Sequence, residues 1–390
     1  MMAAKKDPLF LYVHIPYCVS KCPYCDFNSH VVPEIPEASY TEALIQELNH
    51  YARTADWRER NIQTIFFGGG TPSTFQPASI GRILESADHL FQFDSDCEIT
   101  LEANPGAVES AHFAGYRVCG VNRISVGVQS FQPHLLRFLG RAHTADEAVK
   151  ALHGLTSAGF ENFSLDLIYA NPGQTLCDLA NDLDTALSFQ PPHLSAYNLT
   201  IEEGTPFDHE YRSGRMTLLS EEEEIAMADL IERRLSASGL QRYEISNYAR
   251  PGFHSRHNLN YWQGGDYLGI GAGAHSYQHA SRDGIYGQRW WNEKNPARYM
   301  KTIKETGQAV TGTEQSDLTR APGEYMFAGL RLTAGVSLKA FAARFGKSML
   351  ELYPPISSWV SEGLMEIQGD HVRLTPRGLM VANSLFVHFV

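Results

Sequence analysis

The sequence predicts an α/β protein with a parallel sheet, followed by a smaller mixed α+β domain. Six short apolar runs that favour strands alternate with helical segments between residues 10 and 201. Connections rich in glycine, proline or asparagine follow several of these runs, as in repeated βα units. The pattern changes at about residue 243, where glycine and aromatic residues become dense. We therefore expect a sheet-based domain, a connecting region and a separate C-terminal domain.

The expected strands lie at residues 10–15, 62–67, 98–103, 122–129, 162–168 and 193–201. Helices are expected between them at 37–53, 77–91, 109–116, 133–139, 144–158 and 175–189. The unusual side chains follow the carboxyl ends of several different strands. This distribution favours a barrel, because a barrel collects its site from many strand ends, whereas a doubly wound sheet binds at one switch point.

The remaining segments are expected to differ from one another. A long helix should follow Ser220, which forms a capping-box pattern with Glu223, and the acidic run at 221–224 is favourable charge at that helix N-terminus. We place the barrel at residues 1–242, a connecting region at 243–319 and a winged-helix-like domain at 320–390. Within the connecting region, 243–246 should form one more strand, and 256–276 should be irregular rather than helical.

A hairpin signal identifies the C-terminal domain. Residues 364–367 and 371–374 flank a tight Gly369-Asp370 turn, with helical segments on both sides. A wing of this kind often binds DNA, but no patch of lysine and arginine accompanies it. We therefore expect a structural or lid module.

Composition limits the classes of function. The chain has 390 residues and a formal net charge of −12, which argues against a nucleic-acid partner. No apolar run approaches the roughly 20 residues of a membrane span, and the N-terminus lacks the apolar part of a secretion signal. Three of the six cysteines lie on one loop and the others are scattered, so they form no disulfide ladder. Clustered free thiols suit a reducing compartment, and we expect a cytoplasmic protein.

The three clustered cysteines are Cys18, Cys22 and Cys25, in the pattern C-x3-C-x2-C directly after the first strand. Three thiolates on one short loop form a soft, multidentate metal site. A structural zinc site is usually closed by four ligands, whereas a [4Fe-4S] cluster held by three cysteines keeps one iron open. The alternatives are a zinc loop completed by His14 or His30, or three unrelated thiols.

This spacing, with Tyr24 before the last cysteine, resembles the radical S-adenosylmethionine (SAM) family. The stretch HIPYCVSKCPYCDF resembles one branch of it, which holds the oxygen-independent coproporphyrinogen III oxidase and its haem-chaperone paralogue. The resemblance implies a partial (β/α)6 barrel. It also implies a [4Fe-4S] cluster whose open iron is chelated by SAM, and one-electron cleavage of that SAM.

The resemblance also implies a set of SAM contacts. The glycine-rich turn GGGTP at 68–72 would receive the amino group of SAM, because glycines let a backbone approach a ligand closely. Tyr12 would lie beside the adenosine, and the backbone of Phe27 would meet the adenine. The other implied SAM-contacting residues are Gly69, Gly70, Thr71, Glu102, Gln129, Arg141 and Asp166. Read structurally instead, Glu102 would be a rim salt bridge, and Asp166 would pair with Arg141 or Arg123.

Two departures from the oxidase pattern bear on the choice between the paralogues. The oxidase carries a further cysteine two residues after the third cluster ligand, where this chain has Phe27, and it carries a long N-terminal arm, whereas 17 residues precede Cys18 here. The run His257-Asn258-Leu259-Asn260-Tyr261-Trp262 resembles the haem-chaperone branch. Histidine is a natural axial haem ligand, so His257 is the candidate haem contact. The alternative for His257 is a structural role. His275 is a second candidate haem ligand, and His14 is expected to line the site rather than bind haem.

We therefore expect a radical SAM haem chaperone that binds haem as cargo and transfers it to haem-accepting, respiratory proteins. In this hypothesis the cluster and SAM support transfer or dimerisation, and no residue is catalytic. The main alternative is an enzyme of porphyrin biosynthesis, the oxygen-independent coproporphyrinogen III oxidase, and a third is a radical SAM enzyme for another substrate. A homodimer and peripheral membrane contact are both compatible with the sequence.

Overall fold

A nine-stranded sheet forms the centre of the computed structural model, which describes residues 7–106, 110–279 and 286–389. Its strand order is β7-β8-β6-β5-β4-β3-β2-β1-β9, and strands β1 to β6 run parallel in chain order. These six strands are β1 (Leu9–Ile15), β2 (Ile62–Gly69), β3 (Phe93–Ala103), β4 (Arg123–Gln129), β5 (Phe163–Tyr169) and β6 (His193–Asn198). Since β7 and β9 lie at the two ends of the order, the barrel is partial, and the predicted α/β fold is confirmed.

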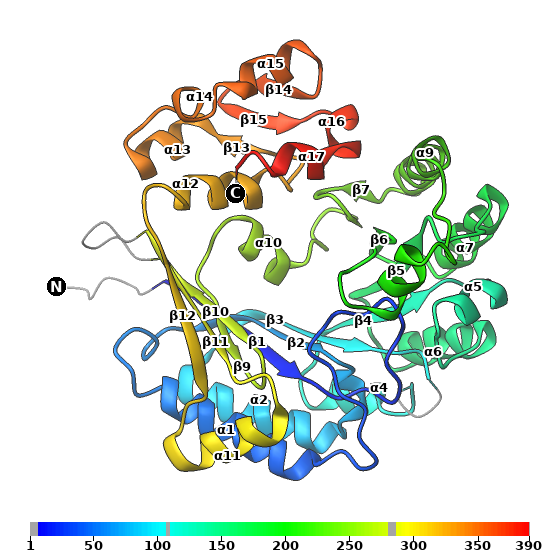
Figure 1. Ribbon diagram of the computed structural model, residues 1–390. Coiled ribbons are helices and arrows are strands. Elements are labelled where there is room, and N and C mark those ends of the chain that lie inside the picture. Colours follow the sequence, from blue (N-terminus) through cyan, green and yellow to red (C-terminus); the bar gives the residue numbers. More distant parts are fainter. Residues whose placement is uncertain (1–6, 107–109, 280–285, 390) are drawn as a thin grey trace.

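Helices follow these strands as the sequence predicts, and Figure 1 shows several of them packed on the outer face of the sheet. They are α1 (Glu37–Tyr51), α2 (Pro77–Phe91), α4 (Phe113–Val118), α5 (Pro133–Phe138), α6 (Ala145–Ser157) and α7 (Leu176–Ser188), then α8 (Pro206–Arg212) and α9 (Glu221–Ala237). Residue 109, the expected start of α4, lies outside the described residues. The capping box of Ser220 and Glu223 is present at the start of α9.

Strand β1 shows how the core and the site divide. Leu9, Leu11 and Val13 are fully buried in the main core, together with apolar residues of α1. Burying each such side chain contributes about 2 kcal/mol. Because neighbouring side chains alternate between the faces of a strand, Tyr12 and His14 point to the other side, into the barrel. One face of β1 thus packs in the core, and the other face points into the site.

The segment after residue 240 adds three short strands to the same sheet. Strands β7 (Gln241–Arg242) and β8 (Asn247–Ala249) pair with each other, and β8 runs antiparallel to β6. Residues 243–246 connect these two strands, so the prediction of a strand at 243–246 is wrong. Strand β9 (Leu268–Ile270) lies parallel to β1.

A short helix, α10 (Arg256–Trp262), occupies the region that was expected to be irregular. The prediction fails because Ser255 caps this helix by accepting a hydrogen bond from the backbone N–H of Asn258. His257 and Asn260 are buried on its inner face, so tertiary packing supplies what the local sequence lacks.

A three-stranded antiparallel sheet follows, in the order β10-β11-β12. Its elements are β10 (His275–Gln278), β11 (Gly287–Asn292) and β12 (Val310–Ser316), with α11 (Pro296–Thr306) between the last two. Helix α11 packs against α1, as Figure 1 shows below the sheet. This arrangement attaches the connecting region firmly to the barrel.

The C-terminal residues form a unit with its own hydrophobic core. It contains α12 (Ala321–Gly329), β13 (Val336–Ser337), α13 (Leu338–Phe345), α14 (Met349–Leu352), α15 (Pro355–Ser361), β14 (Met365–Gln368), β15 (His371–Leu374), α16 (Pro376–Met380) and α17 (Ala382–Phe386). The predicted hairpin is present as β14 and β15, and Figure 1 shows this unit at the top of the molecule. No helix of the described residues is both long and apolar enough to cross a bilayer.

Candidate functional site

The cysteine loop begins where β1 ends and is closed on itself by backbone pairing. Tyr17 and His30 form an isolated parallel bridge, and the backbone N–H of Cys18 donates to the carbonyl of His30 at 3.1 Å. The N–H of His30 donates in turn to the carbonyl of Pro16 at 2.7 Å. This closure holds Cys18, Cys22 and Cys25 on one compact loop at the carboxyl end of the first strand.

The three thiols are free and partly buried. Burial raises the pKa of Cys18 and Cys25, so metal binding must displace their protons. Among the described residues, no three side chains of His, Cys, Asp or Glu converge on one point.

Of the two histidines in the zinc alternative, His14 has hydrogen-bond partners on both ring nitrogens. The hydroxyl of Tyr12 lies 3.0 Å from Nδ1 of His14, whose Nε2 lies 2.9 Å from the carbonyl oxygen of Asn28. Since a carbonyl only accepts, Nε2 carries the proton and Nδ1 accepts from Tyr12. Burial lowers the pKa of His14 to about 4, so this ring is neutral at physiological pH. Nε2 of His30 lies 3.2 Å from Oδ1 of Asn28.

The glycine turn after β2 lies directly against the cysteine loop. The N–H of Gly70 donates to the carbonyl of Ile15, and that of Thr71 to the carbonyl of Tyr17, both at 2.8 Å. Gly69 has a φ of +110°, and a Cβ there would lie 2.5 Å from the ring of His14. A Cβ on Gly70 would lie 2.6 Å from the carbonyl oxygen of Tyr17. Both positions therefore exclude any side chain, because the turn packs closely against β1 and the cysteine loop.

A chain of hydrogen bonds links the thiols to the ends of β2, β3 and β4. The hydroxyl of Thr71 donates to Sγ of Cys18 at 3.4 Å and accepts from Nδ2 of Asn104 at 3.0 Å. Oδ1 of Asn104 accepts from Nη2 of Arg141 at 2.6 Å, while Nη1 of Arg141 donates to Sγ of Cys22 at 3.5 Å. Asn104 was not among the predicted site residues; its place after the third strand, beside Glu102, was the signal for a site role.

Two carboxylates occupy the interior of the barrel. Burial, and then the neighbouring charge of Asp166, raise the pKa of Glu102 to about 8. Burial also raises the pKa of Asp166, whose carboxylate accepts from the hydroxyls of Ser125, at 2.9 Å, and Ser164, at 3.2 Å. Arg123 lowers both pKa values through its charge alone. Among the described residues, the hydrogen-bond partners of Asp166 are hydroxyls rather than the arginines of the salt-bridge alternative.

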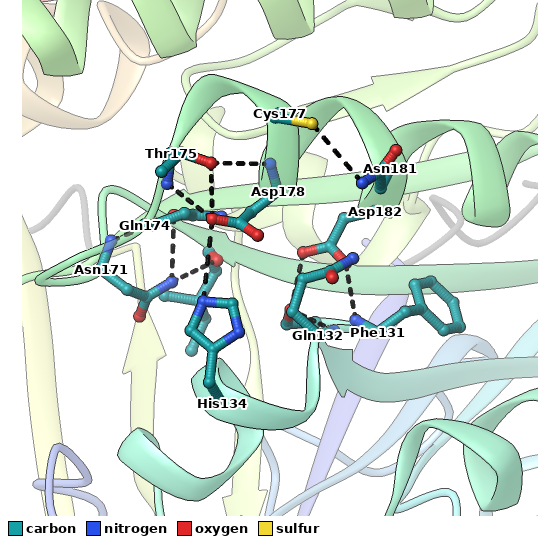
Figure 2. Close-up of polar contacts among 12 residues, drawn as sticks. Phe131, Gln132, His134, Asn171, Gln174, Thr175, Cys177, Asp178, Asn181 and Asp182 are labelled. Carbon is teal, nitrogen blue, oxygen red and sulfur yellow. Dashed lines mark hydrogen bonds and ion pairs between the residues drawn. The ribbon is translucent and has the colours of Figure 1, made fainter.

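Gln129 ends β4 with a φ of +67°, a conformation that costs free energy in a residue other than glycine. The loop after it is held by Asp182 of α7, which is 1% exposed. Its carboxylate accepts from the N–H of Phe131 at 2.8 Å and from the hydroxyl of Ser130 at 2.7 Å. Figure 2 shows Asp182 directed at Phe131 and Gln132. Asp182 thus fixes the loop that follows Gln129. No sequence pattern identified Asp182 as a site residue.

A cavity of about 360 Å³ opens beside the cysteine loop. Its lining residues are Tyr12, His14, Phe27, Asn28, Gly69, Glu102, Tyr261, Tyr267, Gly273, His275 and Lys294. Four of the predicted SAM contacts therefore share one cavity, and the other five are not part of its lining, namely Gly70, Thr71, Gln129, Arg141 and Asp166. Phe27 is 63% exposed at the rim, and its carbonyl accepts from Nζ of Lys21 at 3.2 Å and from the N–H of Ser29 at 2.7 Å.

His257, the predicted haem contact, lies outside this cavity and is 1% exposed. Its Nδ1 lies 2.7 Å from the hydroxyl of Thr64 and its Nε2 lies 2.8 Å from the hydroxyl of Tyr261. Because both ring nitrogens have protein partners, this placement favours the structural alternative. His275 is different, since it is exposed, lines the cavity and stacks on Trp291 with ring centroids 5.7 Å apart.

A partial barrel with three cysteines after β1 and a glycine turn after β2 defines the class of radical SAM proteins. The sequence pattern of the Radical SAM superfamily matches residues 12–186, and that of the HemN C-terminal domain matches residues 317–381. The coproporphyrinogen III oxidase HemN of Escherichia coli superposes with a TM-score of 0.81 and 23% identity, over 99% of this chain and 91% of that one. The two proteins therefore share a fold.

Two curated relatives place the chain more narrowly. Heme chaperone HemW of Escherichia coli (strain K12) is 37% identical over 99% of this chain and 99% of its own length. Heme chaperone HemW of Bacillus subtilis (strain 168) is 37% identical over 97% of this chain and 98% of its own. The chain belongs to the HemW family of the radical SAM superfamily. Membership of the superfamily implies a [4Fe-4S] cluster and SAM, and the thiol loop and the glycine turn fit both.

Proposed function

We propose that this protein is a chaperone that binds haem and transfers it to acceptor proteins. The observation that carries the proposal is the 37% identity, over 99% of both chains, to the relative named Heme chaperone HemW. The oxidase of the same fold is only 23% identical, although the superposition covers nearly the whole chain. The sequence thus resembles the chaperone branch more than the oxidase branch.

Position 27 supports the same choice. The oxidase pattern has a further cysteine there, whereas this chain has Phe27, whose ring is 63% exposed at the rim of the cavity. A phenyl ring supplies neither a thiol nor a proton to a substrate. We therefore propose that oxidative decarboxylation of coproporphyrinogen III is absent, and the oxidase remains the alternative that an assay must exclude.

We propose that Cys18, Cys22 and Cys25 hold the cluster and that the predicted contact residues hold SAM. When bound, the cluster and SAM supply one-electron reductive chemistry. The glycines at 69 and 70 place no side chain between the backbone of the turn and the amino group of SAM. Tyr12 lies beside its adenosine and the backbone of Phe27 meets the adenine, while Glu102, Gln129, Arg141 and Asp166 present the charges and amides that orient it.

The partners follow from this role. We propose that the protein acts in the cytoplasm and delivers haem to respiratory proteins, with no nucleic-acid partner, in keeping with a net charge of −12. The proposal includes a homodimer and a transient membrane contact as states from which the protein delivers haem.

A transfer experiment tests the proposal. The anaerobically reconstituted protein is loaded with haem, separated from free haem, and mixed with the haem-free form of a respiratory haem protein. We expect haem to appear in the acceptor faster than from a control carrier such as serum albumin loaded to the same level. Transfer no faster than from albumin would contradict the chaperone function.

A further inference from the structure

A second cavity, of about 540 Å³, lies between the barrel side of the molecule and the C-terminal unit. Helix α10 and the strands β10 and β11 form one side of it, and α12 and α13 form the other (Figure 1). Its volume lies in the range of pockets that hold small organic ligands. Its lining residues are Tyr261, Trp262, Gly264, Gly265, Tyr267, Tyr277, Arg289, Arg320, Ala321, Glu324, Tyr325, Phe327, Ala328 and Arg344.

The walls of this cavity are aromatic. Tyr267 and Tyr277 stack with ring centroids 6.4 Å apart and an interplanar angle of 29°. Tyr325 and Phe327 of α12 line the opposite side. The indole Nε1 of Trp262 is buried without a hydrogen-bond partner among the described residues. Aromatic side chains present broad faces at little conformational cost, so these walls suit a large, flat, mostly apolar ligand.

Arg344 gives the cavity a positive charge that forms no ion pair with a carboxylate of the described residues. Arg289 pairs with Glu324 at 2.9 Å, and Arg320 pairs with Glu324 and Glu314. Arg344, by contrast, has its Nη2 2.9 Å from Nδ1 of His279 and lies over the ring of Tyr325 at 4.9 Å. Its Nε is buried and has no partner among the described residues. A guanidinium that forms no ion pair within the protein is suited to bind a carboxylate or phosphate of a ligand.

We propose that this second cavity is the haem-binding site, with the porphyrin between the aromatic walls and a propionate on Arg344. The inference rests on the proposed function, because that function requires a site for a flat, dianionic porphyrin. Haem combines a large apolar face with two carboxylates, which the aromatic walls and the free guanidinium complement. The site lies beside the SAM cavity rather than inside it.

The two cavities share part of their walls. Tyr261 and Tyr267 line both of them, with ring centroids 4.6 Å apart. Tyr261 is held by Nε2 of His257 at 2.8 Å, so the buried His257 acts as a positioning residue for the wall between them. In this proposal haem and SAM occupy separate cavities, and the HNxxYW sequence contributes through its tyrosine and tryptophan.

A titration with haem tests the site, using the full chain after anaerobic reconstitution. Ala328→Trp fills the cavity without changing its charge, and Arg344→Gln removes the charge without filling it. Arg233→Gln, at an exposed position of α9, is the matched control. We expect the first two variants to lose about tenfold or more in haem affinity, since a charged hydrogen bond contributes at least that much. The control should bind as the wild type does.

Protoporphyrin IX and its dimethyl ester separate the role of the carboxylates from that of the ring. The free acid should bind the wild type more tightly than the ester, and Arg344→Gln should abolish the difference. Saturating SAM should leave haem bound. Wild-type binding that persists in both Ala328→Trp and Arg344→Gln, or competitive displacement by SAM, would overturn this site and leave the chaperone function standing. A wild type that binds no haem would overturn the proposed function itself.

Discussion

The guanidinium of Arg141 lies 3.5 Å from the sulfur of Cys22, although 119 residues separate them in the chain. The same guanidinium donates to the carbonyl of Gly127 at 2.8 Å and to Oδ1 of Asn104 at 2.6 Å. A cation held this rigidly stabilises a thiolate, because it offsets the negative charge that metal binding creates. Arg141 thereby connects the cysteine loop to the ends of β3 and β4.

Arg141→Gln should weaken binding of the cluster by roughly 10- to 100-fold, the usual effect of removing a partner of a metal ligand. Iron and sulfide content after reconstitution in the presence of a competing chelator measures this loss. The control is Arg137→Gln, at an exposed position of α5 that is close in sequence. Equal cluster retention in the two variants would show that the contact with Cys22 does not act on the cluster.

Glu102 should make SAM binding depend on pH. Its folded-state pKa is about 8, so the carboxylate is largely protonated below that value. The sulfonium of SAM is positively charged and binds better beside an ionised carboxylate. The SAM affinity should therefore rise as the pH rises toward about 8 and level off above it, by up to about tenfold per pH unit. Calorimetric titration of wild type and Glu102→Gln measures this; identical pH profiles would remove Glu102 from the SAM site.

Glu47 should make the stability of the fold depend on pH. It is fully buried, and it accepts from Tyr299, from Nδ2 of Asn292 at 2.7 Å and from the N–H of Gly271 at 2.9 Å. Burial raises its pKa from 4.5 to about 7. Between these values the native state holds the proton that the unfolded state releases. This group's contribution to the free energy of unfolding therefore falls as the pH rises from about 4.5 to about 7.

Comparison of the wild type with Glu47→Gln isolates the contribution of Glu47 to the free energy of unfolding. The variant should be destabilised because it can no longer accept all three hydrogen bonds. Its deficit relative to wild type should shrink by a few kcal/mol, on the order of 3, as the pH rises through the window, since one pKa unit corresponds to about 1.4 kcal/mol. Urea unfolding at the two ends of the window measures the deficit. A deficit that stays constant would mean that Glu47 titrates normally.

His257→Ala should destabilise the fold without removing an iron ligand. The substitution leaves a cavity and strips hydrogen bonds from Thr64 and Tyr261, which should cost about 3 kcal/mol. Thermal unfolding measures the loss, and His275→Ala, at an exposed position, should cost much less. The absorption spectrum of bound haem should keep its ligation pattern in the folded variant. A lost iron ligand there would instead identify His257 as the axial ligand.

The sheet and the cofactor site could be predicted because their signals are local. Apolar runs mark the strands, and parallel order brings their carboxyl ends together. The thiol loop and the glycine turn therefore had to become neighbours, as the bonds from Gly70 to Ile15 and from Thr71 to Tyr17 show. Gly69 and Gly70 could be recognised in the sequence for the same reason, since few roles other than a close approach of the backbone to another group require glycine.

The parts that escaped prediction depend on contacts distant in sequence. Strand β9 has three residues, too few for a periodic pattern, and it forms because β1 offers an unpaired edge. Helix α10 has seven residues and is stabilised by the Ser255 cap and by burial of His257. Asp182 reaches Phe131 across 51 residues of chain. Nothing in the residues around these positions reveals such partners before the fold is known.

The central claim is that a radical SAM scaffold here carries haem instead of oxidising coproporphyrinogen. The most direct measurement gives the anaerobically reconstituted protein coproporphyrinogen III, SAM and a reductant, follows porphyrin products, and determines haem bound per chain in a parallel sample. The account predicts stoichiometric haem binding and no formation of protoporphyrinogen IX. Sustained SAM-dependent decarboxylation by a protein that binds no haem would contradict it.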